Sequence, residues 1–182
     1  MRRIVLIALS TLAMTPSLFA QTTAEIIDRA LAAAPARARE AATVIKWNAD
    51  YTWETLKKGT NKLVCYDRSG EPGEQPFSVQ CTSLGNLPRV AQNRRFNATL
   101  DKAARQAMFD GAEANGTRVK PEYGSVWLSM SGADREHARV HTTIAVPGAT
   151  TQSTGLPDSP KEGGAWIMSA GTTTAHIMTP GS

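Results

Sequence analysis

The chain has 182 residues, of which 41% are hydrophobic and 20% charged, and its formal net charge is +4 at pH 7. This length suits one domain, which buries about two-thirds of its unfolded surface. The densest basic cluster, at Arg89, Arg94 and Arg95, is expected to form a solvated helix or loop face rather than a basic stripe. We therefore expect no nucleic-acid partner.

The first twenty residues are typical of a secretory signal peptide. Arg2 and Arg3 precede an apolar run over 4–14, and a short stretch of small and polar residues ends at Ala20. The run is shorter than the roughly 20 residues that a membrane span needs. We expect cleavage after Ala20, a periplasmic or secreted location, and no membrane span in the mature chain. Without the leader, the basic and acidic counts fall from 20 and 16 to 18 and 16, a net charge of +2.

Cys65 and Cys81 are the two cysteines of the chain. In an oxidising compartment such a pair predicts a disulfide. A bridge that closes about 17 residues stabilises a fold by about 3 kcal/mol in the chain-entropy model. A metal site or a cysteine nucleophile would need a reduced thiolate, which this compartment disfavours.

Hydrophobic periodicity predicts the elements of the N-terminal half in chain order. Thr22 and Glu25 have the spacing of a capping box, and the apolar residues that follow predict an amphipathic helix that ends near Pro35. Runs of β-branched and aromatic residues then predict strands at 43–47, 51–56, 62–66 and 77–81. The loop over 67–76, which carries Glu71 and Glu74, is expected to be solvated.

The C-terminal half is predicted to contain one helix and four strands. The helix begins at Asn97 or Thr99 and ends at Ala112. The strands are expected at 126–131, 140–146, 165–170 and 175–178. The connection over 147–164 is unusually long for a loop without structure. Residues 21–182 are thus predicted to form a single α+β domain, with a mostly antiparallel sheet, the N-terminal and central helices on one face, and one disulfide.

Histidines and methionines are the candidate ligand-binding residues. His137 and His141 are four apart, which would suit a zinc-binding helix, but alternating β-branched residues predict a strand, where that spacing is about 13 Å. His141 and His176, on neighbouring strands, together with Met168 and Met178, are instead predicted to form a ligand site. Imidazole and thioether ligands favour copper. The alternative is that the methionines fill the core and that each histidine is satisfied by a hydrogen bond.

Sequence signals for catalysis are weak. The chain has no Gly-x-Ser-x-Gly nucleophile elbow. Ser131, His141 and Asp134 could form a Ser/His/Asp catalytic triad, but no sequence motif supports this set. We therefore assign no catalytic residue.

The most specific pattern lies at the end of the chain. It reads GGAWIM at 163–168, AGT at 170–172 and AHIM at 175–178, followed by Pro180. Together with Gly-Thr-Asn at 59–61, these residues resemble a family of uncharacterised small exported bacterial proteins. The resemblance implies export and a disulfide rather than a reaction, and it places His141 and His176 at matched positions. This chain departs from the family pattern at Ala165, Ser169 and Thr173-Thr174, where Pro, Trp and Pro-Tyr are expected.

These observations favour an exported soluble protein that acts as a non-catalytic binding or structural module. Its partner would be an unidentified small molecule or protein, and no resident cofactor is expected. Two alternatives remain open. One is a periplasmic hydrolase-like enzyme that uses His141 or His176 as a general base, and the other is a protein that handles copper or haem.

Overall fold

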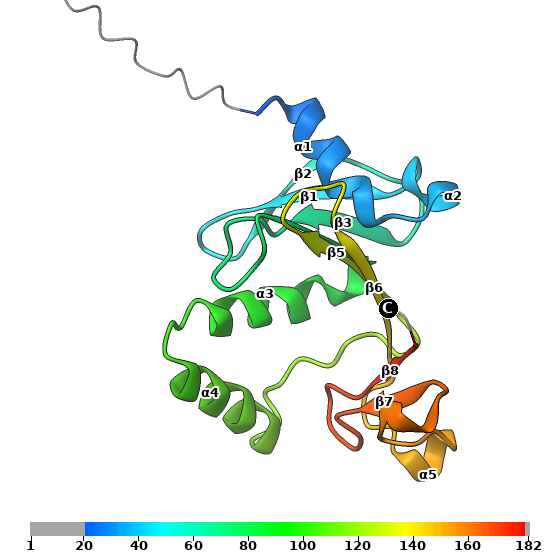
Figure 1. Ribbon diagram of the computed structural model, residues 1–182. Helices are drawn as coiled ribbons and strands as arrows, with labels where there is room; N and C mark the ends of the chain where they lie inside the picture. Colours follow the sequence, from blue (N-terminus) through cyan, green and yellow to red (C-terminus); the bar gives the residue numbers. More distant parts are fainter. Residues whose placement is uncertain (1–20, 181–182) are drawn as a thin grey trace, which may run out of the picture.

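The computed structural model describes residues 21–180, so the predicted leader lies outside the described residues. Eight strands form one mixed sheet in the order β2-β1-β3-β4-β5-β6-β8-β7 (Figure 1). The strands are β1 Thr43–Trp47, β2 Trp53–Lys57, β3 Leu63–Asp67, β4 Phe77–Ser83, β5 Val126–Gly132, β6 Arg139–Ala145, β7 Trp166–Met168 and β8 His176–Met178. Neighbouring strands are antiparallel except for the parallel pair β1 and β3.

Five helices and three 3₁₀ turns accompany the sheet within residues 21–180. The helices are α1 Thr23–Ala30, α2 Ala36–Arg39, α3 Leu87–Asn97, α4 Lys102–Ala114 and α5 Thr151–Thr154. The 3₁₀ turns are η1 Leu31–Ala33, η2 Leu84–Asn86 and η3 Pro160–Glu162. In the described part of the chain, no helix has the length and apolarity needed to cross a lipid bilayer.

Helix α1 covers one face of the sheet. It starts with the predicted capping box, in which the Thr22 side chain accepts from the Glu25 amide and the Glu25 carboxylate accepts from the Thr22 amide. The core beneath it is formed by buried apolar residues of α1, η1 and four strands. These are Ala30, Leu31, Ala33, Ala34, Ala42, Val44, Cys65, Phe77, Val79, Cys81 and Leu128. The core on this face therefore extends from β1 to β5.

The predicted disulfide is confirmed and lies in this core. Cys65 of β3 and Cys81 of β4 are directly opposite in the antiparallel ladder, with 4.1 Å between their Cα atoms. Neither cysteine has any exposed surface. The bridge therefore joins two central strands beneath η1 and does not border the solvent.

Helix α3 covers the opposite face. Ile45, Val64 and Tyr66 pack against Leu87 and Val90 of α3. Neighbouring residues along a strand point to opposite faces, so α1 and α3 lie on different sides of the sheet, as Figure 1 shows. The α+β class, the mostly antiparallel sheet and the single disulfide are confirmed. The helices are divided between two faces, where the sequence predicted one, because β1 and β3 carry consecutive apolar residues and need cover on both sides.

The start of α3 is fixed by a buried asparagine. The side-chain amide of Asn86 donates to Thr82 Oγ1 at 2.8 Å and to Ser125 Oγ at 2.9 Å. Its carbonyl oxygen accepts from the backbone amide of Glu122 at 2.8 Å. Asn86 thus holds the end of β4, the start of α3 and the approach to β5 together.

The loop between β3 and β4 differs from the expected solvated segment. Glu71 forms ion pairs with Arg94 and Arg68, and Glu74 pairs with Arg68 at 2.5 Å. The Glu71 side chain is only 13% exposed. The expectation that both glutamates are solvated is therefore wrong, because α3 brings Arg94 against the loop.

Smaller differences concern the ends of elements. Strand β2 starts at Trp53, two residues later than expected, because Tyr51 has a positive φ of 68° in the preceding turn. Helix α4 starts after Asp101, whose carboxylate accepts from the Ala104 amide at 2.7 Å. The long connection over 147–164 contains α5 and η3.

We expect loss of the disulfide to lower the free energy of unfolding by about 3 kcal/mol, because the reduced unfolded chain regains the entropy of the closed loop. The variant is Cys65→Ala/Cys81→Ala, which introduces no buried hydroxyl. Urea denaturation measures the change, with reduced and oxidised wild-type protein as the matched comparison. Equal unfolding midpoints for the oxidised wild type and the variant would contradict this expectation.

Candidate functional site

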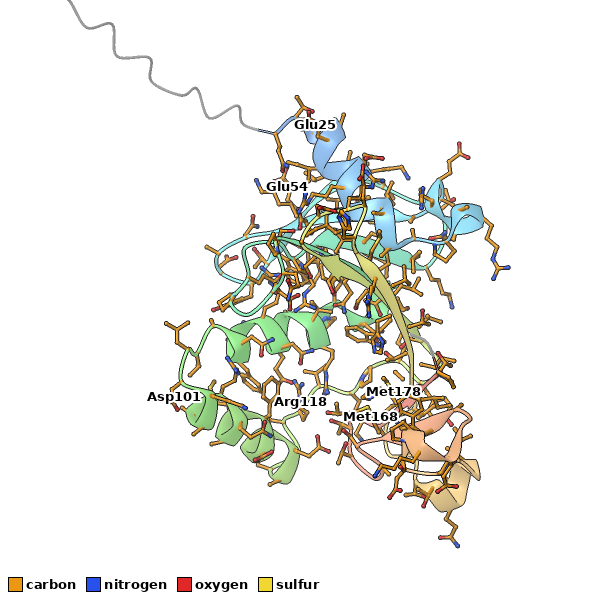
Figure 2. All side chains as sticks on the ribbon, in the orientation of Figure 1. Glu25, Glu54, Asp101, Arg118, Met168 and Met178 are labelled. Carbon is orange, nitrogen blue, oxygen red and sulfur yellow. A yellow bond between two sulfur atoms is a disulfide. The ribbon has the colours of Figure 1, made fainter. Side chains whose placement is uncertain are left out.

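The structure brings three of the four predicted site residues together. On β8, His176 lies opposite Met168 of β7 and Ala145 of β6, and Met178 lies two residues further along β8. Side chains at directly opposite positions have Cβ atoms about 4.5–5.5 Å apart. Met168, His176 and Met178 therefore share one face, and Figure 2 shows the two methionines near each other beside β7 and β8.

The fourth residue, His141, lies elsewhere on the same face. It pairs with Ser129 of β5 and precedes Ala145, the partner of His176, by four positions on β6. This spacing separates the two histidines by about 13 Å along the strand. The register therefore does not bring His141 into the cluster, and its binding role stays a prediction.

The Ser131, His141 and Asp134 set is not assembled. The Asp134 carboxylate contacts Nδ1 of His137 at 2.7 Å, and Ser131 lies opposite Arg139 on β6. His137 precedes β6 in a turn, so the helical spacing that zinc binding would need is absent there. The geometry gives no support to a serine nucleophile at this position.

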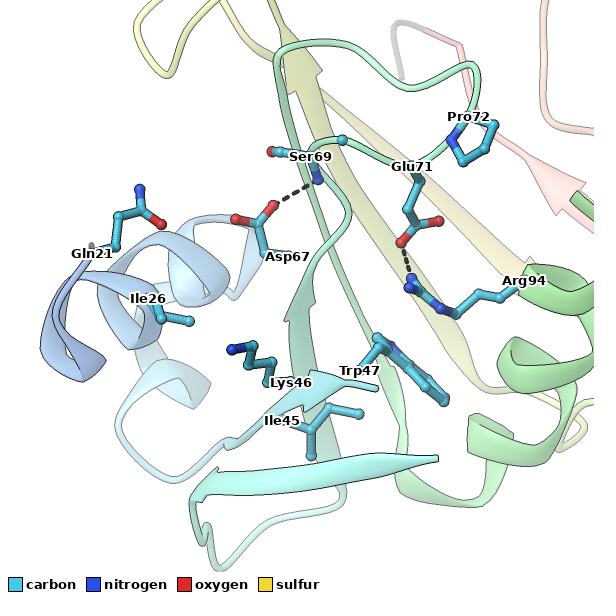
Figure 3. Close-up of a pocket in the computed structure, with 11 residues that line it drawn as sticks. Gln21, Ile26, Ile45, Lys46, Trp47, Asp67, Ser69, Glu71, Pro72 and Arg94 are labelled. Atoms are coloured by element: carbon cyan, nitrogen blue, oxygen red, sulfur yellow. Dashed lines mark hydrogen bonds and ion pairs between the residues drawn. The ribbon is translucent and has the colours of Figure 1, made fainter. Parts of the chain in front are cut away.

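A crevice of about 600 Å³ opens where β1 and β3 diverge beyond the Val44–Cys65 pair (Figure 3). Its charged lining residues balance one another and are Lys46, Asp67, Glu71 and Arg94. Arg94 is paired with Glu71, and Asp67 is paired with Arg29 at 2.8 Å. Trp47 Nε1 and Arg94 Nε have no hydrogen-bond partner among the described residues, but both atoms are buried and inaccessible from the crevice. This crevice therefore offers no excess charge to a ligand.

A second hollow, here called the arginine cleft, lies between α3, α4 and the β7–β8 loop at 169–174. It consists of two cavities, of about 150 Å³ and about 410 Å³, that share Arg89, Asn93 and Thr174. The smaller cavity is also lined by Pro121, Trp127, Thr143, Ala145, Ala175 and His176. The larger one is also lined by Gln106, Phe109, Asp110, Glu113, Arg118, Ser169 and Thr172. One predicted site residue, His176, therefore borders this cleft.

Arg89 occupies the centre of the arginine cleft. Its side chain is almost completely buried, with 3% exposure. Nη1 donates to the Val119 carbonyl oxygen at 2.6 Å and to Thr173 Oγ1 at 3.2 Å, and Nη2 donates to Thr174 Oγ1 at 2.7 Å. The expectation of a solvated Arg89 is therefore wrong, because the β7–β8 loop closes over α3 at this point.

Arg118 borders the larger cavity and is 6% exposed. Its Nη1 and Nη2 atoms donate to Gln92 Oε1 and Asn93 Oδ1, each at 2.5 Å. The guanidinium carbon lies 5.6 Å from the Phe96 ring centre and 4.8 Å from that of Phe109, within the range of cation–π attraction. These contacts hold Arg118 between α3 and α4.

The two arginines are the buried charged residues of the cleft. Burial lowers the pKa of Arg89 and of Arg118 to about 10, and both remain protonated at neutral pH. Within residues 21–180, neither forms an ion pair with a carboxylate within 4.0 Å. Glu113 is the nearest balancing charge and affects both pKa values, while Asp110 is exposed at the rim. The larger cavity is therefore lined by two cations and two anions, and of these four charged residues only the two arginines are buried.

Glu113 is held in its charged form. Its carboxylate accepts from the backbone amide and from Oγ1 of Thr173, both at 2.6 Å. Burial alone would raise the pKa of Glu113, but these hydrogen bonds and the charges of Arg89 and Arg118 lower it below its ordinary value. Glu113 thus anchors α4 to the β7–β8 loop.

Hydrogen-bond donors remain in the cleft. A guanidinium group has five N–H groups. In the described part of the chain, Arg89 uses three of them in hydrogen bonds and Arg118 uses two. Two N–H groups of Arg89 and three of Arg118 are therefore not used in these hydrogen bonds.

Sequence reasoning missed this site because it left 87–97 without a helix. Pro88 at the helix start and the apolar pair Leu87 and Val90 were the available signals. Nothing in the sequence shows that Arg89 is buried, since its partners Val119, Thr173 and Thr174 lie 30, 84 and 85 positions away.

In the described part of the chain, no three His, Cys, Asp or Glu side chains gather closely enough to hold a metal ion. Comparison of the chain with models of known protein families, with curated proteins and with solved structures gave no match.

The lowered pKa of Glu113 predicts a specific pH dependence of stability. A carboxylate whose pKa is lower in the folded state stabilises the protein above its unfolded pKa, here 4.5, and this contribution is lost as the pH falls through the lowered value. The Glu113→Gln variant should therefore be less stable than wild type at neutral pH, and the difference should shrink as the pH falls below 4.5. Urea denaturation at several pH values measures it.

The matched control is Glu162→Gln, which removes one exposed carboxylate at η3. A difference between wild type and Glu113→Gln that is constant from neutral to acidic pH would contradict the assigned role of Glu113.

Proposed function

We propose that the protein is an exported, non-catalytic binding module that takes a small molecule with a carboxylate or phosphate group in the arginine cleft. The observation that carries this proposal is the burial of the positive charges of Arg89 and Arg118, while the two carboxylates that line the cleft, Asp110 and Glu113, are more exposed and form no ion pair with them. A buried charge without a counter-charge is costly, and an anionic ligand would remove that cost. Guanidinium groups are also well suited to carboxylate and phosphate oxygens.

The dimensions and lining of the cleft support a small ligand. The larger cavity, at about 410 Å³, falls in the range of about 300–1,000 Å³ found for small-molecule sites. Phe109 and Trp127 supply aromatic surface in the two cavities, and Thr172 and Thr174 supply hydroxyl groups. The ligand we propose therefore has one anionic group at the arginines and a compact, partly apolar body.

A binding role is favoured over catalysis by what the titratable groups already do. His176 contacts the Thr174 carbonyl oxygen through Nδ1 at 2.8 Å, and Glu113 accepts two hydrogen bonds from Thr173. Among the described lining residues, no serine or threonine hydroxyl is bonded to a histidine, as a nucleophile and its base would be. These side chains position the β7–β8 loop.

Export is supported by two separate features. The first twenty residues have the charged head, apolar run and small-residue end of a signal peptide. The Cys65–Cys81 disulfide is typical of proteins that mature in an oxidising compartment. Both features agree with a binding role in the periplasm or outside the cell.

The proposal predicts that small oxyanions stabilise the protein. Phosphate, pyrophosphate, acetate and succinate are compared with chloride at equal ionic strength by thermal denaturation, and the best anion is titrated by calorimetry. We expect at least one of these anions to raise the melting temperature. The Arg118→Gln variant should bind that anion at least tenfold more weakly, because one charge-assisted contact is worth about 1.5–3 kcal/mol.

Arg37→Gln is the matched control, since Arg37 is exposed on α2, outside the cleft. Amide NMR shifts of Asn93 and Gln106 in the wild type provide a readout that does not depend on the folding of a variant. No stabilisation beyond that of chloride, or unchanged affinity in Arg118→Gln, would overturn the proposal.

A further inference from the structure

We propose that β7 and β8 carry a binding site for monovalent copper, Cu(I), formed by Met168, His176 and Met178 beside the indole of Trp166. This site is separate from the proposed anion site, although His176 borders both.

The register places four side chains at the corners of a square. Trp166 lies opposite Met178, and Met168 lies opposite His176. Residues two apart on a strand share a face, so all four side chains lie on the same side of the sheet. Opposite Cβ atoms are about 4.5–5.5 Å apart and diagonal partners about 7–8 Å apart. Long methionine side chains can bring both sulfur atoms to one point next to the imidazole across these spacings.

His176 is held in the state that a metal ligand requires. Its Nδ1 atom lies 2.8 Å from the Thr174 carbonyl oxygen. A carbonyl oxygen only accepts hydrogen bonds, so Nδ1 is the donor, and in the neutral imidazole Nε2 is then the nitrogen with the free lone pair. Metal-binding histidines commonly have such a second bond, which fixes the ring and the tautomer.

The methionines are not needed as core residues here. The alternate residues, Ile167 and Ile177, supply the apolar packing of this hairpin on the other face, and Ile167 is 1% exposed. Met168 is 42% exposed on a three-residue edge strand. Met178 and His176 are half-buried. A metal ion can therefore reach the cluster from solvent.

The ligand chemistry selects the ion. Two thioethers and one imidazole form a neutral, soft set that favours Cu(I) over zinc or magnesium. The face of the indole of Trp166 can add cation–π attraction. Arg89 lines the same small cavity as His176, and its positive charge opposes a divalent ion more strongly than a monovalent one.

The first test is an anaerobic titration in which the mature protein competes with the chromophoric chelator bicinchoninate for Cu(I). We expect one Cu(I) per chain for the wild type. Met168→Leu and Met178→Leu should each weaken binding at least tenfold, because leucine keeps the volume but removes a ligand atom. Met108→Leu, which removes a methionine from α4, should bind as wild type does. Zn(II) should not compete.

The second test uses Ag(I), a redox-stable substitute for Cu(I), and protein labelled with carbon-13 at the methionine methyl groups. The methyl signals of Met168 and Met178 should shift on addition of one equivalent, while those of Met108 and Met130 stay in place. This measurement needs no variant.

Absence of Cu(I) binding in the wild type, or wild-type affinity in either leucine variant, would overturn the proposal. The Arg118→Gln variant separates the two proposals, since it should lose the oxyanion and keep Cu(I). Loss of both ligands in that variant would show that the sites are not independent.

Discussion

The hydrogen bonds of the Arg89 side chain join three segments that are far apart in the chain. Arg89 belongs to α3, and its guanidinium donates to Val119 in the segment before β5 and to Thr173 and Thr174 between β7 and β8. These hydrogen bonds hold the segments together firmly because they are buried. A buried hydrogen bond is stronger than an exposed one, and a buried polar group without a partner costs more free energy. The same burial leaves a positive charge that forms no ion pair with a carboxylate among the described residues. The position of the C-terminal hairpin and the chemistry of the cleft therefore have one common origin.

Much of the sheet follows from local patterns. The period-2 alternation of side chains predicted β5 and β6, and the Thr22–Glu25 spacing predicted the start of α1. The cysteine pair predicted the disulfide. The strand and helix signals can be read because each depends on residues close together in the chain. The disulfide can be predicted because the chain has only two cysteines.

The remaining features depend on contacts between distant residues. Helix α3 has only Leu87 and Val90 as buried apolar residues, so its periodicity is weak. The burial of Arg89 requires the β7–β8 loop to close over it. The meeting of Met168 with His176 and the separation of His141 are set by strand register, and a shift of one residue would move each side chain to the other face. Residue types indicated candidate ligands, but pairing decided which of them are neighbours.

Strands β4 and β5 are neighbours in the sheet although residues 84–125 separate them in the chain. The hydrogen bond between Gln80 and Ser129 crosses this junction and joins residues 49 positions apart. Within each half of the sheet, β1–β4 and β5–β8, partners are closer in sequence. Closing a long loop costs more entropy than closing a short one, and non-local pairing slows folding. We therefore expect each half to gain structure early, and the rate of folding to be set by the closure of this one ladder.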